Sequence, residues 1–96
     1  MQCIVRPAAA ADIEEAFLWY ESQRAGLGLG FLSAAQTLMD AIVEHPLGYP
    51  VVRRNTRRAL LGHFPYAMYY RVYDDIVVVV ACMHGRRNPR RWQSRA

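Results

Sequence analysis

The feature that most constrains the fold is a change in the period of the apolar residues near the middle of the chain. Up to residue 45 they recur every three or four positions, which is the spacing of a helix with one buried face. From residue 51 onward they alternate or run continuously, which is typical of strands. The sequence therefore predicts a helical half followed by a half made of strands.

The first half predicts two helices joined by a glycine-rich turn. A short strand-like run, Cys3–Val5, precedes them. We expect the first helix to begin at Asp12, where an acid three residues later completes a capping-box pattern, and to end near Arg24. The three glycines of Gly26–Gly30 favour a tight turn over a phosphate loop, because a helix and not a strand precedes them. The second helix is expected over Leu29–Glu44.

The second half predicts consecutive strands that pair in antiparallel order because the turns between them are short. The expected strands are Val51-Val52, Ala59–Phe64, Tyr66–Tyr73 and Ile76–Cys82, with a basic turn over Arg53–Arg58. The helical pair must cover one face of this sheet to bury its apolar stripe. The expected fold is α+β with two layers: an N-terminal strand and a helical hairpin packed on one face of an antiparallel sheet. The order is β-α-α-β-β-β-β with a short basic C-terminal tail, in a single domain over residues 1–96. The other face should stay partly open and show Tyr69, Arg71 and Tyr73.

Positive charge is concentrated in the second half and consists entirely of arginine. Residues 1–50 contain two arginines and six acidic residues, a net of −4, and residues 51–96 contain ten arginines and two acids, a net of +8, which gives the overall +4. Planar guanidinium groups favour bidentate contacts with carboxylates or phosphates. The basic half therefore predicts an anionic partner, which is either a nucleic acid or an acidic protein.

Several classes of protein and site are not expected. The longest strongly apolar run, Ile76–Met83, is far shorter than the ~20 residues that cross a bilayer, and the start of the chain lacks a signal-peptide pattern. Cys3 and Cys82 each lie in an apolar run and are interpreted as buried, reduced thiols. The three histidines do not share a helix face, so neither a metal nor a cofactor is expected. These observations predict a cytoplasmic protein without a membrane segment.

Arginines could also support RNA cleavage by attack of the 2′-hydroxyl, which needs a base, an acid and cations near the phosphate. The side chains that could take these roles are Arg58, Arg71, Arg87, His84, His63, Tyr69, Tyr73 and Arg86. The alternative is structural, because tyrosine-rich strands usually pack with half-buried rings and a dense arginine run is usually a partner-binding surface.

Six short stretches follow one another through most of the chain. They are Ala11–Ala16, Trp19–Glu21, Gly28–Phe31, Ile42–Pro46, Phe64–Tyr70 and His84–Trp92. Together they resemble the RelE/ParE superfamily, the toxins of bacterial type II toxin–antitoxin pairs. The fold of that family, a helical hairpin on an antiparallel sheet, agrees with the order of elements predicted above.

The resemblance implies one of two activities. ParE-like members inhibit DNA gyrase by binding it, without a demonstrated nuclease centre. RelE-like members are ribosome-dependent endoribonucleases that cut messenger RNA, with basic residues on the central strands and a Tyr or His near the C-terminus. Here Arg87 matches the arginine after the last strand, but Ala67 and Trp92 stand at two other positions of the nuclease set.

The glycine-rich helix junction and the Arg-Arg-Asn-Pro ending look more like the ParE side. A gyrase-binding toxin, which is not an enzyme, is therefore the first hypothesis, and an RNA endonuclease is the alternative. A plain nucleic-acid-binding module is a third interpretation, which the charge permits but no recognition-helix signature supports.

The resemblance also implies a partner. This is a ParD-like antitoxin with a ribbon-helix-helix start and a C-terminal tail that wraps the toxin, so a hetero-oligomer is expected. The residues expected to contact it are Leu18, Trp19, Tyr20, Leu27, Arg53 and Arg54. Those expected to contact the gyrase or ribosome target are Arg86, Arg87, Arg90, Arg91 and Trp92, with the tryptophan as an exposed anchor.

Overall fold

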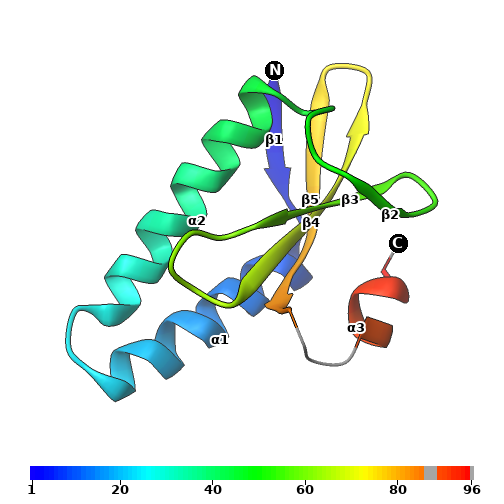
Figure 1. Ribbon diagram of the computed structural model, residues 1–96. Helices are drawn as coiled ribbons and strands as arrows, with labels where there is room; N and C mark the ends of the chain where they lie inside the picture. The colour runs from blue at the N-terminus through cyan, green and yellow to red at the C-terminus, as the bar shows by residue number, and fades with distance from the viewer. Residues whose placement is uncertain (86–88, 96) are drawn as a thin grey trace.

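The computed structural model describes residues 1–85 and 89–95, and these form a two-layer α+β arrangement (Figure 1). A hairpin of two helices lies against one face of a five-stranded sheet, and a short third helix lies on the other side. The elements are β1 (Gln2–Val5), α1 (Pro7–Gln23), α2 (Leu27–Glu44), β2 (Val51–Arg53), β3 (Thr56–Leu60), β4 (Tyr66–Tyr73), β5 (Ile76–His84) and α3 (Pro89–Gln93). The predicted fold class and element order are confirmed.

The sheet has the strand order β1-β5-β4-β3-β2. Strands β2 to β5 form the predicted antiparallel meander. Strand β1, however, pairs with β5 in parallel, from Gln2 opposite Ile76 to Val5 opposite Val79, so the sheet is mixed and not wholly antiparallel. Because two helices and three strands separate β1 from β5, no short turn forces them into antiparallel pairing.

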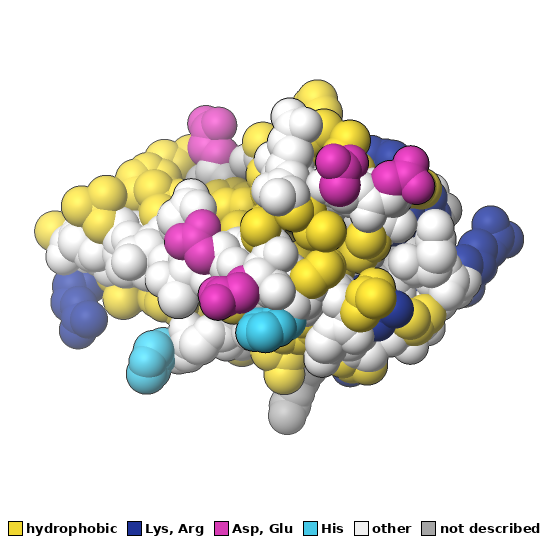
Figure 2. Space-filling model, turned by 90° about the horizontal axis from the view of Figure 1, so that it is seen from above, with side chains coloured by type: hydrophobic (Ala, Val, Ile, Leu, Met, Phe, Trp, Pro, Cys, Tyr) yellow, Lys and Arg dark blue, Asp and Glu magenta, His cyan; other side chains and the backbone are white. Residues whose placement is uncertain are grey.

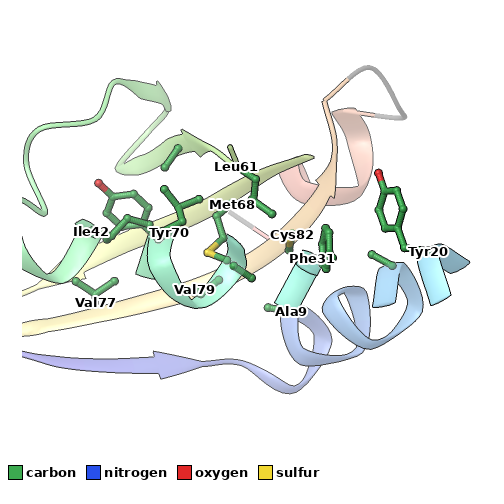
Figure 3. Close-up of a cluster of buried hydrophobic side chains, with 14 residues drawn as sticks. Ala9, Tyr20, Phe31, Ile42, Leu61, Met68, Tyr70, Val77, Val79 and Cys82 are labelled. Carbon is green, nitrogen blue, oxygen red and sulfur yellow. The ribbon is translucent and has the colours of Figure 1, made fainter. Parts of the chain in front are cut away.

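The larger core lies between the helical hairpin and the face of the sheet that it covers (Figure 3). The buried stripe of α2 has the predicted helical spacing and consists of Phe31, Ala35, Leu38 and Ile42. Alternate residues of β4 meet it, among them Met68 and Tyr70. The hydroxyl of Tyr70 donates a hydrogen bond to the Pro46 carbonyl at 2.6 Å, and burial raises the pKa of this phenol to about 12. Its polar atom is thus satisfied within an apolar layer.

The glycine-rich segment is the predicted tight turn, and it brings the two helices into direct contact. Gly26 has a φ of 89°, which favours glycine, and α2 begins at Leu27, two residues earlier than expected. The Glu21 carboxylate of α1 accepts hydrogen bonds from the backbone N–H groups of Gly26 and Gly28, both at 2.9 Å. A carboxylate from one helix therefore caps the N-terminus of the next.

The start of α1 differs from the sequence-based expectation. The helix begins at Pro7 and not at Asp12, because proline has a helix-compatible φ and the first helical residue needs no N–H partner. Asp12 consequently lies in the second turn of α1 with its side chain buried. The capping-box interpretation of this residue is wrong.

Strand β3 also differs from its prediction. It covers Thr56–Leu60 and not Ala59–Phe64, so half of the expected basic turn lies in β3, and Arg53 of that turn lies in β2. Thr56 is fully buried, and the guanidinium of Arg57 donates hydrogen bonds to the carbonyls of Tyr49 at 2.6 Å and Leu47 at 3.3 Å. These contacts stabilise an extended backbone over Thr56–Arg58. The charged, polar character of this stretch favoured a turn and gave no local signal for a strand.

Candidate functional site

The outer face of the sheet, which points away from α1 and α2, is partly covered by α3. The Trp92 ring stacks on the Tyr69 ring with centroids 4.4 Å apart and an interplanar angle of 13°. Trp92 is only 6% exposed, and it packs in a second, smaller core with Ala67, Val80, Ala81 and Met83. Stacking removes both aromatic rings from water, so neither the expected open position of Tyr69 nor an exposed Trp92 anchor is found. Trp92 anchors α3 to the sheet instead.

A second anchor ties Arg95, two residues beyond the end of α3, to the first helix. Arg95 and Asp12 form a bidentate ion pair, with Nη1 2.6 Å from Oδ2 and Nη2 3.3 Å from Oδ1. The Cys82 backbone N–H donates to the same Oδ2 at 3.0 Å, and Arg95 also reaches the Val80 carbonyl at 3.3 Å. We call the ion pair between Asp12 and Arg95 the Asp12–Arg95 clamp.

A bulge in β5 lies beside this clamp, at the residue whose carbonyl Arg95 contacts. Tyr69 pairs with Ala81 and Tyr70 with Val79, so Val80 is an extra residue between two ladder positions. Both Val80 and Ala81 therefore pack on the α3 side of the sheet. Burial, and secondly the charge of Asp12, raises the pKa of the nearby Cys82 thiol to about 12, so this thiol stays protonated.

The two anchors divide the basic tail into inward and outward side chains. Trp92 is buried and Arg95 is partly buried, whereas Arg90 and Arg91 on the same short helix are exposed. Arg86 and Arg87, which were also expected to contact the target, lie outside the described residues. Of the three described residues in the expected target-binding set, Trp92 is buried and only Arg90 and Arg91 are exposed, on an anchored turn.

Two further arginines lie on the outer face of the sheet beside α3. Arg58 pairs with Tyr69 across β3 and β4, and a hydrogen bond from Arg58 partly offsets the burial that raises the pKa of the Tyr69 phenol. Arg71 donates to the Thr56 hydroxyl at 3.3 Å and to the Tyr73 hydroxyl at 3.0 Å. The bond from Arg71 lowers the pKa of Tyr73. We call Arg58 and Arg71 the basic face. Arg91 instead lines a small cavity with Asp12, Glu15 and His84.

His84 does not join the arginines that were grouped with it as potential nuclease residues. It pairs with Tyr66, whose ring lies 5.6 Å from its own, and Tyr66 packs against the helix-facing core. Side chains of paired residues point to the same side of a sheet, so His84 lies on the opposite side from Arg58 and Arg71. The sheet thus separates the proposed base from the proposed phosphate ligands, and Arg87 is outside the described residues.

The residues expected to contact an antitoxin do not form one patch. Leu18 and Trp19 are 57% and 55% exposed on α1, but Tyr20 is 9% exposed and Leu27 is half-buried. Arg53 and Arg54 are exposed at the β2–β3 turn, at the other end of the molecule from the α1–α2 turn (Figure 1). Figure 2 shows apolar side chains over much of one face, while arginines lie mainly toward the end that carries the β2–β3 turn. A single partner would have to span both ends.

The exposed apolar surface of the hairpin is wider than the sequence predicted. Leu29 and Leu32 of α2 are exposed, and neither was singled out as a contact residue. Both are apolar but do not share the helical spacing of the buried stripe of α2. That mismatch is the sequence signal that could have identified them as exposed apolar residues.

The basic face can bind anions but has no described metal centre. Within residues 1–85 and 89–95, no three His, Cys, Asp or Glu side chains lie close enough to hold a metal ion together. No helix in the same residues has both the length and the hydrophobicity needed to cross a membrane.

The comparisons with known proteins point in one direction. Residues 3–89 match the family model described as the ParE toxin of the type II toxin–antitoxin system parDE. The fold is similar to a solved structure described as the chromosomal ParDE TA system from P. aeruginosa, with a TM-score of 0.66 and 18% sequence identity. That similarity covers 88% of this chain and 95% of the other. No curated protein matches the sequence.

Proposed function

The chain belongs to the ParE toxin family of type II toxin–antitoxin systems, and from this membership we propose that it inhibits DNA gyrase by binding it. We also propose that a cognate, ParD-like antitoxin neutralises it by forming a complex. Both partners act in the cytoplasm, which is the proposed site of action.

The observation that carries the target-binding proposal is the anchored turn that holds Arg90 and Arg91 outward. The stacking of Trp92 and the Asp12–Arg95 clamp fix the backbone of this turn, so little backbone entropy remains to be lost when the arginines bind. Arg58 and Arg71 add further positive charge on the outer face of the sheet. A rigid, purely arginine surface supports binding to an anionic target, and it supports proton transfer less well because arginine stays charged.

We expect the double substitution Arg90→Ala, Arg91→Ala to weaken gyrase inhibition strongly. Loss of two charge-assisted contacts of roughly 0.7–1 kcal/mol each raises the half-inhibitory toxin concentration about tenfold to thirtyfold. The measurement is the supercoiling of relaxed plasmid by purified gyrase over a series of toxin concentrations.

The double substitution Arg53→Ala, Arg54→Ala is the matched control, since it removes the same charge from the β2–β3 turn. It should leave gyrase inhibition within about twofold and should weaken antitoxin binding instead. Equal inhibition by the Arg90/Arg91 double variant and the unchanged chain would contradict the role of the anchored turn. Failure of the unchanged chain to inhibit gyrase, together with codon-positioned cuts on translating ribosomes, would refute the gyrase proposal itself.

The ribosome-dependent nuclease alternative has less support. Ala67 is buried beneath α3, Trp92 carries no titratable proton, and His84 lies across the sheet from Arg58 and Arg71. In-line cleavage needs the base and the cations around one phosphate.

For the antitoxin, we propose that Leu18 and Trp19 form the centre of the contact. We expect Leu18→Ala to weaken antitoxin binding about tenfold, because truncation of an interface leucine loses roughly 1.5 kcal/mol of apolar burial. The measurement is titration calorimetry with the purified antitoxin. Leu47→Ala is the control, because Leu47 is 68% exposed just beyond the other end of α2. Equal losses in the two variants would contradict the proposed contact.

A further inference from the structure

A cavity of about 270 Å³ lies between α1 and the ends of β4 and β5. It is lined by Glu15, Trp19, Tyr20, Pro65, Tyr66 and His84. Its volume is below the ~300–1,000 Å³ of pockets that hold whole small molecules, so it suits a single side chain. It is separate from the basic face, because α1 and Tyr66 lie on the helix side of the sheet.

Three aromatic rings form much of this cavity. The Tyr20 ring is in edge-to-face contact with Trp19 at 5.0 Å and with Tyr66 at 6.0 Å, and Tyr66 contacts His84 at 5.6 Å. Tyr20 is nearly buried whereas Trp19 is more than half exposed, so Trp19 lies nearer to solvent. The rings are fixed against one another before any ligand enters.

Glu15 supplies the charge of the cavity. Its carboxylate has no hydrogen bond or ion pair with any described residue, unlike Asp12 one turn earlier, which is neutralised by Arg95. Arg91 lines a smaller cavity of about 50 Å³ next to this one, which shares Glu15, Tyr66 and His84 with it. Among the described residues that line the 270 Å³ cavity, Glu15 is the one formally charged side chain when histidine is counted as neutral.

The chemistry of the lining selects among possible occupants. An anion would be repelled by the Glu15 carboxylate, and an apolar side chain could contact the rings but would leave this exposed carboxylate without a partner. A guanidinium can stack on aromatic rings and donate two parallel hydrogen bonds to the carboxylate. We propose that this cavity is a binding site for an arginine side chain of a partner protein, and the proposal stands independently of gyrase inhibition.

The test is titration of the full chain, made by cell-free synthesis, with a blocked tripeptide that has arginine between two glycines. Binding is followed by the NMR signals of the two indole N–H groups. We expect the Trp19 signal to shift in a saturable way at millimolar peptide, while the Trp92 signal, on the other side of the sheet, stays unchanged. The same tripeptide with citrulline, which has nearly the same shape without the charge, should produce no saturable shift.

Glu15→Gln should weaken binding of the arginine peptide about fivefold or more, because a charge-assisted contact is replaced by a neutral one. Glu14→Gln is the matched control, since Glu14 is exposed on the same helix, as Glu15 is, but does not line the cavity. No saturable shift of Trp19, equal binding of the citrulline peptide, or equal losses in the Glu15 and Glu14 variants would each overturn the proposal. None of these results depends on whether gyrase is the target.

Discussion

Gly28→Ala is expected to lower the melting temperature by roughly 12–24 °C, because the new methyl group costs about 3 kcal/mol in a domain of this size. A Cβ at this position would lie 2.6 Å from the Phe17 carbonyl oxygen and 2.9 Å from the Glu21 carboxylate. The carbonyl belongs to the backbone of α1 and cannot rotate away. Alanine normally favours a helix over glycine by about 1 kcal/mol, so the clash must reverse a favourable change. Thermal unfolding followed by circular dichroism measures the effect.

Gly30→Ala is the control for this substitution. It lies in the same helix two residues later, but a Cβ there would have only Phe64 near it, at 3.9 Å. Because there is space for the methyl group, this variant should melt at the same temperature or a few degrees higher. Equal melting temperatures of the two variants would show that the close approach of the two helices does not require glycine at position 28.

The second large effect is expected from Asp12→Ala, which should destabilise the fold by about 3 kcal/mol. The substitution leaves the Arg95 guanidinium and the Cys82 N–H without their carboxylate partner in a largely buried position. Because the clamp holds the end of α3, Trp92 should become more exposed. Urea unfolding gives the change in stability, and a red shift of tryptophan fluorescence reports the exposure.

Glu14→Ala removes the same charge from an exposed position two residues further along α1, and it should change stability by less than about 0.5 kcal/mol. A double-mutant cycle with Arg95→Ala should give a coupling energy of about 1 kcal/mol or more. Additive effects of the two substitutions would show that the ion pair contributes nothing beyond its separate side chains.

The elements that carry their own local signal could be predicted from the sequence. The helical spacing of Phe31, Ala35, Leu38 and Ile42 is visible without any structure, and so is the alternation of Tyr66–Tyr73. The glycine turn was also predictable. Its tight geometry follows from Gly26 and from the space that Gly28 leaves, which are properties of the residue type.

The side chains that depend on distant partners could not be assigned in the same way. Asp12 has the local pattern of a helix cap, but its actual partner is Arg95, 83 positions away. Trp92 in an arginine run has the pattern of an exposed anchor, but Tyr69 of β4 provides a ring on which it stacks. In both cases the stronger interaction comes from tertiary packing, which local spacing does not encode.

The parallel pairing of β1 with β5 has a consequence for the order in which the molecule assembles. Strands β4 and β5 are joined by a two-residue turn and can form early, whereas β1 must close a loop of more than seventy residues to find its register. The Asp12–Arg95 clamp spans a similar separation. These contacts therefore have the largest loop-closure cost and are expected to form late. The surface that displays Arg90 and Arg91 is then complete only after the rest of the sheet is in place.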